Sequence, residues 1–147
     1  MPPAASVNAS IQDMAIWLNA QLGHHPDVLS PGLLAKIQTP QVNTPGELRS
    51  SGWRHDRLSK ASYALGWRVF TYQGRTMVFH GGAVRGYRGL VAFLPEQDTG
   101  IAVLWNSESA SPSAFLPTWM DRALGVQGKD WLGLNDAADE SAEAAQD

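Results

Sequence analysis

Apolar residues recur at helical spacing in two segments near the start of the chain. Ser10 and Asp13 fit a capping box that opens the first helix, and Gly23 is a natural stop. A second helix is expected from Ser30-Pro31, because proline suits the first helical position, and Pro40 closes it. The apolar stripes are Ile11, Met14, Ala15, Leu18 and Leu22 in the first segment, and Leu33, Leu34 and Ile37 in the second.

The middle of the chain has the composition of β-strands. Residues 63–72 are rich in aromatic and β-branched side chains, and Gln73-Gly74 predicts a tight turn into a return strand over residues 75–80. Residues 88–94 and 101–105 are predicted to form a second pair of strands, and their cores, residues 90–94 and 101–105, are nearly continuous apolar runs, which are typical of strands covered on both faces. Connections of hairpin length predict that the sheet is antiparallel.

Two further segments complete the layout. Residues 39–58 are polar and are predicted to form a long loop. A final helix is predicted near residues 114–124, with Pro117 in its first turn and Gly125 at its end. The fold class is therefore α+β, an antiparallel sheet with flanking N- and C-terminal helices.

Composition divides the chain into a folded part and a tail. The 147 residues are 44% hydrophobic and 17% charged, which suits one globular domain over residues 1–132. Residues 133–147 hold five of the 14 acidic residues and no base, and are predicted to be a disordered acidic tail. The net charge of −3 offers no basic footprint, so nucleic acid is not an expected partner.

Several kinds of site and location are disfavoured by what the sequence lacks. There is no cysteine, so disulfides and thiolate metal sites are excluded, and no cofactor or metal is predicted. No apolar run approaches the roughly 20 residues of a membrane span, so no membrane partner is expected. Residues 1–5 lack the features of a signal peptide, and the chain as written is expected in the cytoplasm.

The candidate chemistry lies where the strand over residues 75–80 reaches His80-Gly81-Gly82. A histidine titrates near neutral pH and serves as a proton donor or acceptor. Glycines keep side chains out of the way, so that a substrate can lie along the strand edge as an added strand. A strand end followed by a plain glycine turn would have the same letters, so the tripeptide alone is a weak signal.

The surroundings of this tripeptide resemble the C-terminal part of the serine β-lactamase and penicillin-binding-protein family. His80-Gly81-Gly82 is similar to the third active-site element of that family, commonly Lys-Thr-Gly, on an edge strand of the cleft. Leu65-Gly66-Trp67, Gly86-Tyr87-Arg88 and residues 91–95 resemble the neighbouring strands and turn in the same order. The resemblance covers about residues 5–132 and implies a partial β-lactamase/transpeptidase-like fold.

The resemblance also implies roles for individual residues. His80 would place a proton donor or cation beside the carboxylate or leaving group of the substrate, and Gly81-Gly82 would leave room for that substrate. The backbone N–H of Ala83 would be one of two oxyanion donors. Tyr87 and Arg88 are weaker substrate-binding candidates, because Arg88 is as well suited to a structural ion pair.

The nucleophile of that family is missing from these 147 residues. The family chemistry uses Ser-x-x-Lys, which puts nucleophile and base on one helical face, and then Tyr-x-Asn. Here no lysine has a serine three positions before it, and no tyrosine has an asparagine two positions after it. Ser6-Val7-Asn8 has the letters of a Ser-x-Asn variant, but it precedes a helix start and is interpreted as coincidence. The chain alone is therefore expected to be inactive.

Two hypotheses about function remain. The first is the C-terminal portion of a serine hydrolase that acts on a β-lactam, a D-Ala-D-Ala peptide or an ester, with His80 favouring peptide or ester. The second is a non-catalytic module that binds a peptide or a subunit. The chain is expected to supply helices for only one sheet face, so a separate N-terminal half or a second copy is the predicted partner. Export to the periplasm or outside the cell is expected for a full-length parent.

Overall fold

The computed structural model describes residues 7–109 and 114–133. The chain divides into two compact units, Met1–Glu108 and Ser109–Asp147. Except for Gly133, the predicted acidic tail over residues 133–147 lies outside the described residues.

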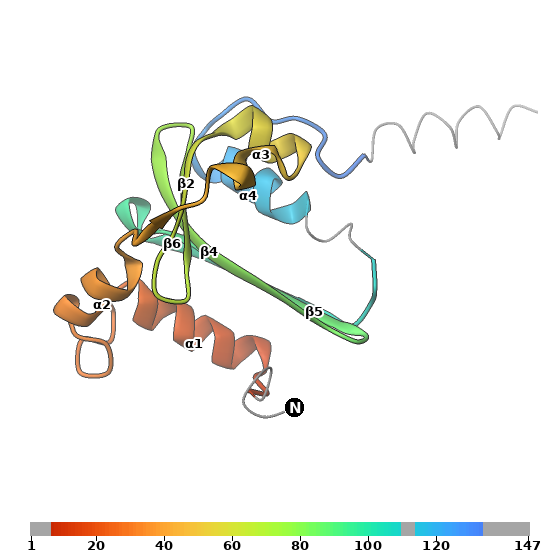
Figure 1. Ribbon diagram of the computed structural model, residues 1–147. Coiled ribbons are helices and arrows are strands. Elements are labelled where there is room, and N and C mark those ends of the chain that lie inside the picture. Colours follow the sequence, from red (N-terminus) through yellow and green to blue (C-terminus); the bar gives the residue numbers. More distant parts are fainter. Residues whose placement is uncertain (1–6, 110–113, 134–147) are drawn as a thin grey trace, which may run out of the picture. The chain divides into compact units, whose positions relative to one another are not determined.

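The first unit is built on one antiparallel sheet of six strands, whose spatial order follows the chain order (Figure 1). The strands are β1 (Val42–Asn43), β2 (Leu58–Tyr63), β3 (Arg68–Tyr72), β4 (Arg75–Val84), β5 (Tyr87–Leu94) and β6 (Thr99–Trp105). The green β4 and β5 run together as a long ribbon in Figure 1. The predicted antiparallel sheet is confirmed.

The predicted strand over residues 63–72 is two strands. β2 ends at Tyr63 and β3 begins at Arg68. A turn joins them, in which the N–H of Ala64 donates to the carbonyl of Trp67 at 2.7 Å and Gly66 has φ +82°. Glycine adopts this backbone conformation without strain, so Gly66 was the sequence signal for the break.

β4 also differs from its prediction, because it does not end at His80. At the start of β4, Gln73 and Gly74 both have positive φ, as the predicted tight hairpin turn requires. At the other end, Gly81 and Gly82 are extended and pair with Leu90 and Gly89 of β5, so β4 continues to Val84. The turn is made instead at Gly86, with φ +76°.

The predicted long loop over residues 39–58 is wrong. This stretch contains β1, a 3₁₀ helix η1 (Pro45–Arg49) and helix α3 (Gly52–Arg57), and the start of β2. Glu47 of η1 forms ion pairs with Arg54 of α3 and Arg68 of β3. These ion pairs link the segment to the sheet, so its polar side chains have partners within the fold.

The two predicted N-terminal helices are confirmed as α1 (Ile11–Gln21) and α2 (Pro31–Gln38). The backbone N–H of Ser10 donates to Oδ2 of Asp13 at 2.8 Å, and the N–H of Asp13 donates to Oγ of Ser10 at 3.2 Å. These bonds from Ser10 lower the pKa of the Asp13 carboxyl. The capping box therefore determines where α1 begins.

α1 packs on one face of the sheet. The buried core on that side consists of Leu18, Ala64, Trp67, Val69, Val78, Val91 and Phe93. The rings of Trp67 and Phe93 meet edge to face at 5.2 Å. A Cβ on Gly100 would lie 2.8 Å from Leu18 and 2.9 Å from the carbonyl oxygen of Ala92, so glycine lets α1 approach β6 closely.

The opposite face is covered in part by α3. Strand alternation puts Phe70 and Phe79 on that face, where their rings lie 4.9 Å apart. The guanidinium of Arg54 lies 5.5 Å and 5.7 Å from the centres of these two rings. The prediction that one face lacks a helix therefore fails for the region around these two rings.

The second unit contains the predicted final helix, α4 (Phe115–Ala123). Pro117 lies in its first turn, and Gly125 follows it with φ +63°. The indole N–H of Trp131 donates to Oδ2 of Asp121 at 2.8 Å, so the chain folds back on α4. Within the described residues, no helix is long and apolar enough to cross a membrane.

Candidate active site

His80 marks the point where one edge of β4 becomes open. β3 accompanies β4 only as far as the pair Arg68 and Phe79. From His80 to Val84, β4 pairs with β5 on one side, and no other described strand pairs with it on the other. An extended peptide can bind along such an edge as an added strand.

A groove of about 870 Å³ is lined by residues of this stretch of β4 together with residues of β5, β6 and the start of the chain. It brings together five of the six predicted site residues, namely His80, Gly82, Ala83, Tyr87 and Arg88, whereas Gly81 does not line it. Asn8, which precedes α1, and Met14, in the first part of α1, also line the groove. Sequence reasoning missed Asn8, although the letters Ser6-Val7-Asn8 were the available signal. Ser6 itself lies outside the described residues.

The surroundings of His80 favour its neutral form. Burial lowers the pKa of the imidazole, and the positive charge of Arg68 lowers it further. The hydroxyl of Tyr63 lies 3.5 Å from Nε2 of His80. Neither Tyr63 nor Arg68 was singled out from the sequence.

Arg68 is itself held by a carboxylate. Its Nη1 lies 2.5 Å from Oε1 of Glu47, and Arg54 binds the other oxygen of Glu47. Burial raises the pKa of Glu47, but the hydrogen bonds and charges of Arg68 and Arg54 outweigh it, so the pKa falls below its ordinary value. The carboxylate therefore stays ionised beside two guanidinium groups.

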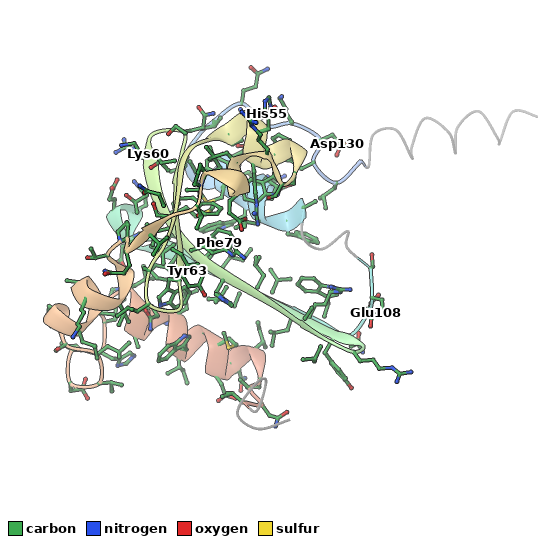
Figure 2. All side chains as sticks on the ribbon, in the orientation of Figure 1. His55, Lys60, Tyr63, Phe79, Glu108 and Asp130 are labelled. Atoms are coloured by element: carbon green, nitrogen blue, oxygen red, sulfur yellow. The ribbon has the colours of Figure 1, made fainter. Side chains whose placement is uncertain are left out.

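Arg88 forms the structural ion pair that was one of its two predicted roles. Its Nη2 lies 2.7 Å from Oε2 of Glu108, and the N–H of Gly86 donates to Oε1 at 2.8 Å. The Gly86 bond, followed by the Arg88 interaction, lowers the pKa of Glu108. Figure 2 places Glu108 beside the far end of the β4–β5 ribbon. Tyr87, in the same hairpin, is 65% exposed.

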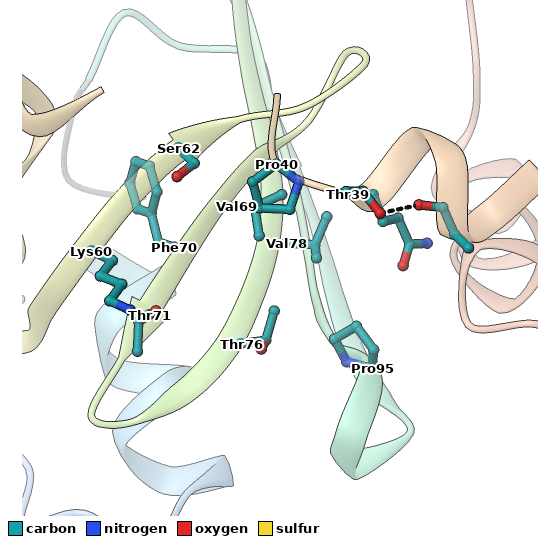
Figure 3. A pocket seen from close by; sticks show the side chains of 12 residues that line it. Thr39, Pro40, Lys60, Ser62, Val69, Phe70, Thr71, Thr76, Val78 and Pro95 are labelled. Atoms are coloured by element: carbon teal, nitrogen blue, oxygen red, sulfur yellow. Dashed lines mark hydrogen bonds between the residues drawn. The ribbon is translucent and has the colours of Figure 1, made fainter. Parts of the chain in front are cut away.

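A second hollow, of about 350 Å³, lies over β2, β3 and β4 (Figure 3). Its polar lining side chains include Lys60, Thr71 and Thr76, and Pro40 and Pro95 also line it. None of the predicted site residues lines it, so the groove beside His80 is the better candidate site.

The remaining described histidines do not form a metal site. Of His24, His25 and His55, two contact a carboxylate: His24 lies 2.6 Å from Asp98 and His55 lies 3.3 Å from Asp56. Across residues 7–109 and 114–133, no group of three or more metal-ligating side chains comes together.

Comparison with known proteins shows which family the chain belongs to. The family model described as Beta-lactamase matches residues 1–124. This chain belongs to the β-lactamase family. The solved structure of the octameric penicillin-binding protein homologue from Pyrococcus abyssi superimposes with a TM-score of 0.70 and 25% identity, over 85% of this chain and 26% of that one. The partial β-lactamase/transpeptidase-like fold is thereby confirmed.

Two curated relatives of this β-lactamase-family chain are named as hydrolases. Unguisins hydrolase ungD' of Aspergillus campestris is 31% identical over 116 residues, which is 78% of this chain and 20% of that protein. Unguisins hydrolase ungD of Aspergillus violaceofuscus is 22% identical over 143 residues, 86% of this chain and 24% of that protein. The chain thus spans about a fifth to a quarter of the length of these relatives.

Gly82 allows the groove to be tested separately from the fold of this β-lactamase-family chain. A Cβ at Gly82 would meet nothing within 4 Å, and the backbone is already extended, so Gly82→Val is expected to leave the melting temperature within about 2 °C of wild type. Its side chain would project into the groove and weaken ligand binding there. Calorimetry and binding of an acyl peptide would measure the two effects, and loss of the fold would contradict the first.

Proposed function

We propose that this chain supplies one wall of a serine-hydrolase cleft, formed by His80 and the open edge of β4. The observation that carries this proposal is the unpaired edge of β4, which begins at His80 and whose residues His80, Gly82 and Ala83 line a large groove. Membership of the β-lactamase family and the names of the two relatives support acyl transfer as the chemistry. The substrate would be a peptide or an ester in preference to a β-lactam, since histidine replaces the commoner lysine.

The nucleophile would come from a region outside these 147 residues. Neither Ser-x-x-Lys nor Tyr-x-Asn occurs in the sequence, so this chain alone would form no acyl-serine. A region that carries both elements, on the same or a separate polypeptide, would complete the cleft. The relatives support this arrangement, because the matched part is only about a quarter or less of each protein.

Exposed apolar side chains mark the surface where this region would bind. Val84, Tyr87 and Leu104 are 49%, 65% and 42% exposed, and all three line the groove. Apolar groups gathered around a groove indicate a surface that another polypeptide covers. We propose that the Ser-x-x-Lys region is this partner, and that docking places its serine opposite His80.

A covalent probe tests the proposed function. The chain alone is expected to show no labelling by a fluorophosphonate and no hydrolysis of p-nitrophenyl acetate. Co-expression with a region from the same genome that encodes Ser-x-x-Lys and Tyr-x-Asn is expected to produce both, and Ser→Ala in that region should abolish them. Labelling of the isolated chain, or an assembled complex with no activity, would contradict the proposal.

The second candidate is a binding module without catalysis. The same exposed apolar groups favour it, because they fit a second copy of the chain as well as a catalytic partner. Sedimentation equilibrium separates the two candidates. A stable homodimer that buries Tyr87, with no Ser-x-x-Lys region that binds it, would favour the module.

A further inference from the structure

We propose that His80 is kept as an uncharged imidazole by its neighbours Arg68 and Tyr63, with Glu47 bound to Arg68. The cleft would therefore bind acyl substrates that carry no carboxylate next to His80. The substrate part of this inference rests on the proposed function. Arg68, Tyr63 and Glu47 are positioning residues, because they act on the substrate through His80.

The first step of the argument is the cation next to His80. Arg68 is the last residue of β3 to pair with β4, and its partner there is Phe79, directly before His80. Its guanidinium lies 5.9 Å from the centre of the Tyr63 ring, and the Tyr63 hydroxyl lies 3.5 Å from Nε2 of His80. The three side chains therefore form one group at the open edge, with a fixed positive charge at one end.

The second step is the lack of a compensating acid. In the described part of the chain, the polar side chain that contacts the His80 ring is Tyr63, through its hydroxyl, and no carboxylate bonds to the ring. Glu47 forms ion pairs with Arg68 and Arg54. Glu108 accepts hydrogen bonds from Arg88 and from the N–H of Gly86. The β5 residue that pairs with His80 is Val91, which carries no charge. An imidazolium here would face a cation without a counter-ion.

The third step concerns the hydrogen bond of Tyr63. When His80 is neutral, Nε2 can accept from the Tyr63 hydroxyl, and Nδ1–H is left as the donor. This tautomer presents one N–H to a substrate or leaving group but no net charge. A lysine at this position would attract a substrate carboxylate, whereas a neutral imidazole would not. Neutral esters and amides are therefore the substrates that fit.

Two substitutions of the surrounding charged residues are expected to shift the pKa of His80 in opposite directions. Arg68→Gln removes the cation, so the pKa of His80 should rise toward its ordinary value. Glu47→Gln leaves Arg68 uncompensated, so the pKa of His80 should fall further. Arg68→Lys retains the charge and should keep the pKa low. Arg75→Gln is the matched control, because Arg75 lies at the far end of β4, is 58% exposed and pairs with Glu96.

An NMR titration of the imidazole Cε1–H signals in the full chain tests the inference, with His80→Asn to assign the signal. We expect the titration midpoint of His80 to lie below that of a model histidine. Arg68→Gln should raise this midpoint and Glu47→Gln should lower it. Tyr63→Phe should change the ¹⁵N shifts that report the tautomer. Added acetate, as the simplest carboxylate, should leave the midpoint unchanged.

Three results would overturn the inference: a midpoint at or above the ordinary value, no response to Arg68→Gln, or a midpoint that acetate raises. If Arg68→Gln does not fold, Arg68→Lys and Glu47→Gln still test the sign of the effect. This titration needs no catalysis, whereas the proposed function is tested by covalent labelling, so failure of one is distinguishable from failure of the other.

Discussion

Replacement of Phe93 by alanine is expected to destabilise the first unit by about 3–5 kcal/mol. Phe93 is fully buried between α1 and the sheet, opposite Val78 in the strand register, and its ring meets Trp67 edge to face. Because the core around it is built from large side chains on several strands, the cavity cannot close without moving β5. Denaturant unfolding of the full chain, followed by tryptophan fluorescence, measures the loss.

Leu65→Ala is the matched control for this prediction. Leu65 lies in the turn between β2 and β3 and is 51% exposed, so its truncation should change the free energy of unfolding by no more than about 0.5 kcal/mol. Equal effects of the two substitutions would mean that the core between α1 and the sheet does not stabilise the unit. A loss of 3–5 kcal/mol is a large share of the 5–15 kcal/mol of a typical domain.

His80→Ala is expected to lower kcat/KM for a neutral ester by about 10²–10⁴-fold once the chain is joined by the Ser-x-x-Lys region. The reason is that His80, at the start of the open edge, lines the groove and can move a proton beside the substrate. Hydrolysis rates of the assembled enzyme measure the loss. His55→Ala is the control, because the His55 side chain is 75% exposed and does not line the groove.

The conservative counterpart of this experiment is His80→Lys, which restores the residue that the family commonly has. This variant is expected to recover part of the activity and to shift preference toward substrates that carry a carboxylate, because an ammonium group attracts it. If His80→Ala retains the full rate, His80 has no part in the chemistry and the groove serves binding alone.

Local features of the fold could be predicted from neighbouring residues. The capping box of Ser10 and Asp13 and the turn at Gln73-Gly74 form within a few residues, so their letters suffice. The same holds for Pro117 in the first turn of α4. The absence of Ser-x-x-Lys is also a property of the sequence alone, and no structure was needed to establish it.

The candidate site was predictable only in part. His80 could be singled out because its tripeptide lies within an ordered series of family-like segments. Tyr63 lies 17 positions earlier in the chain, and its contact with His80 arises because β2, β3 and β4 are neighbours in the sheet. Arg68 and Glu47 were not found for the same reason, since their ion pair connects η1 with β3.

The sequence by itself determined α1, α2, α4, the turn at Gln73-Gly74 and the antiparallel type of sheet, because these depend on hydrogen bonds and apolar periodicity within short segments. The tertiary structure decided that β4 runs through Gly81-Gly82, since only pairing with β5 distinguishes a glycine strand from a glycine turn. It also decided which charged group lies near His80 and how closely α1 approaches the sheet at Gly100. These features depend on residues far apart in the chain, whose proximity is set by the assembled sheet.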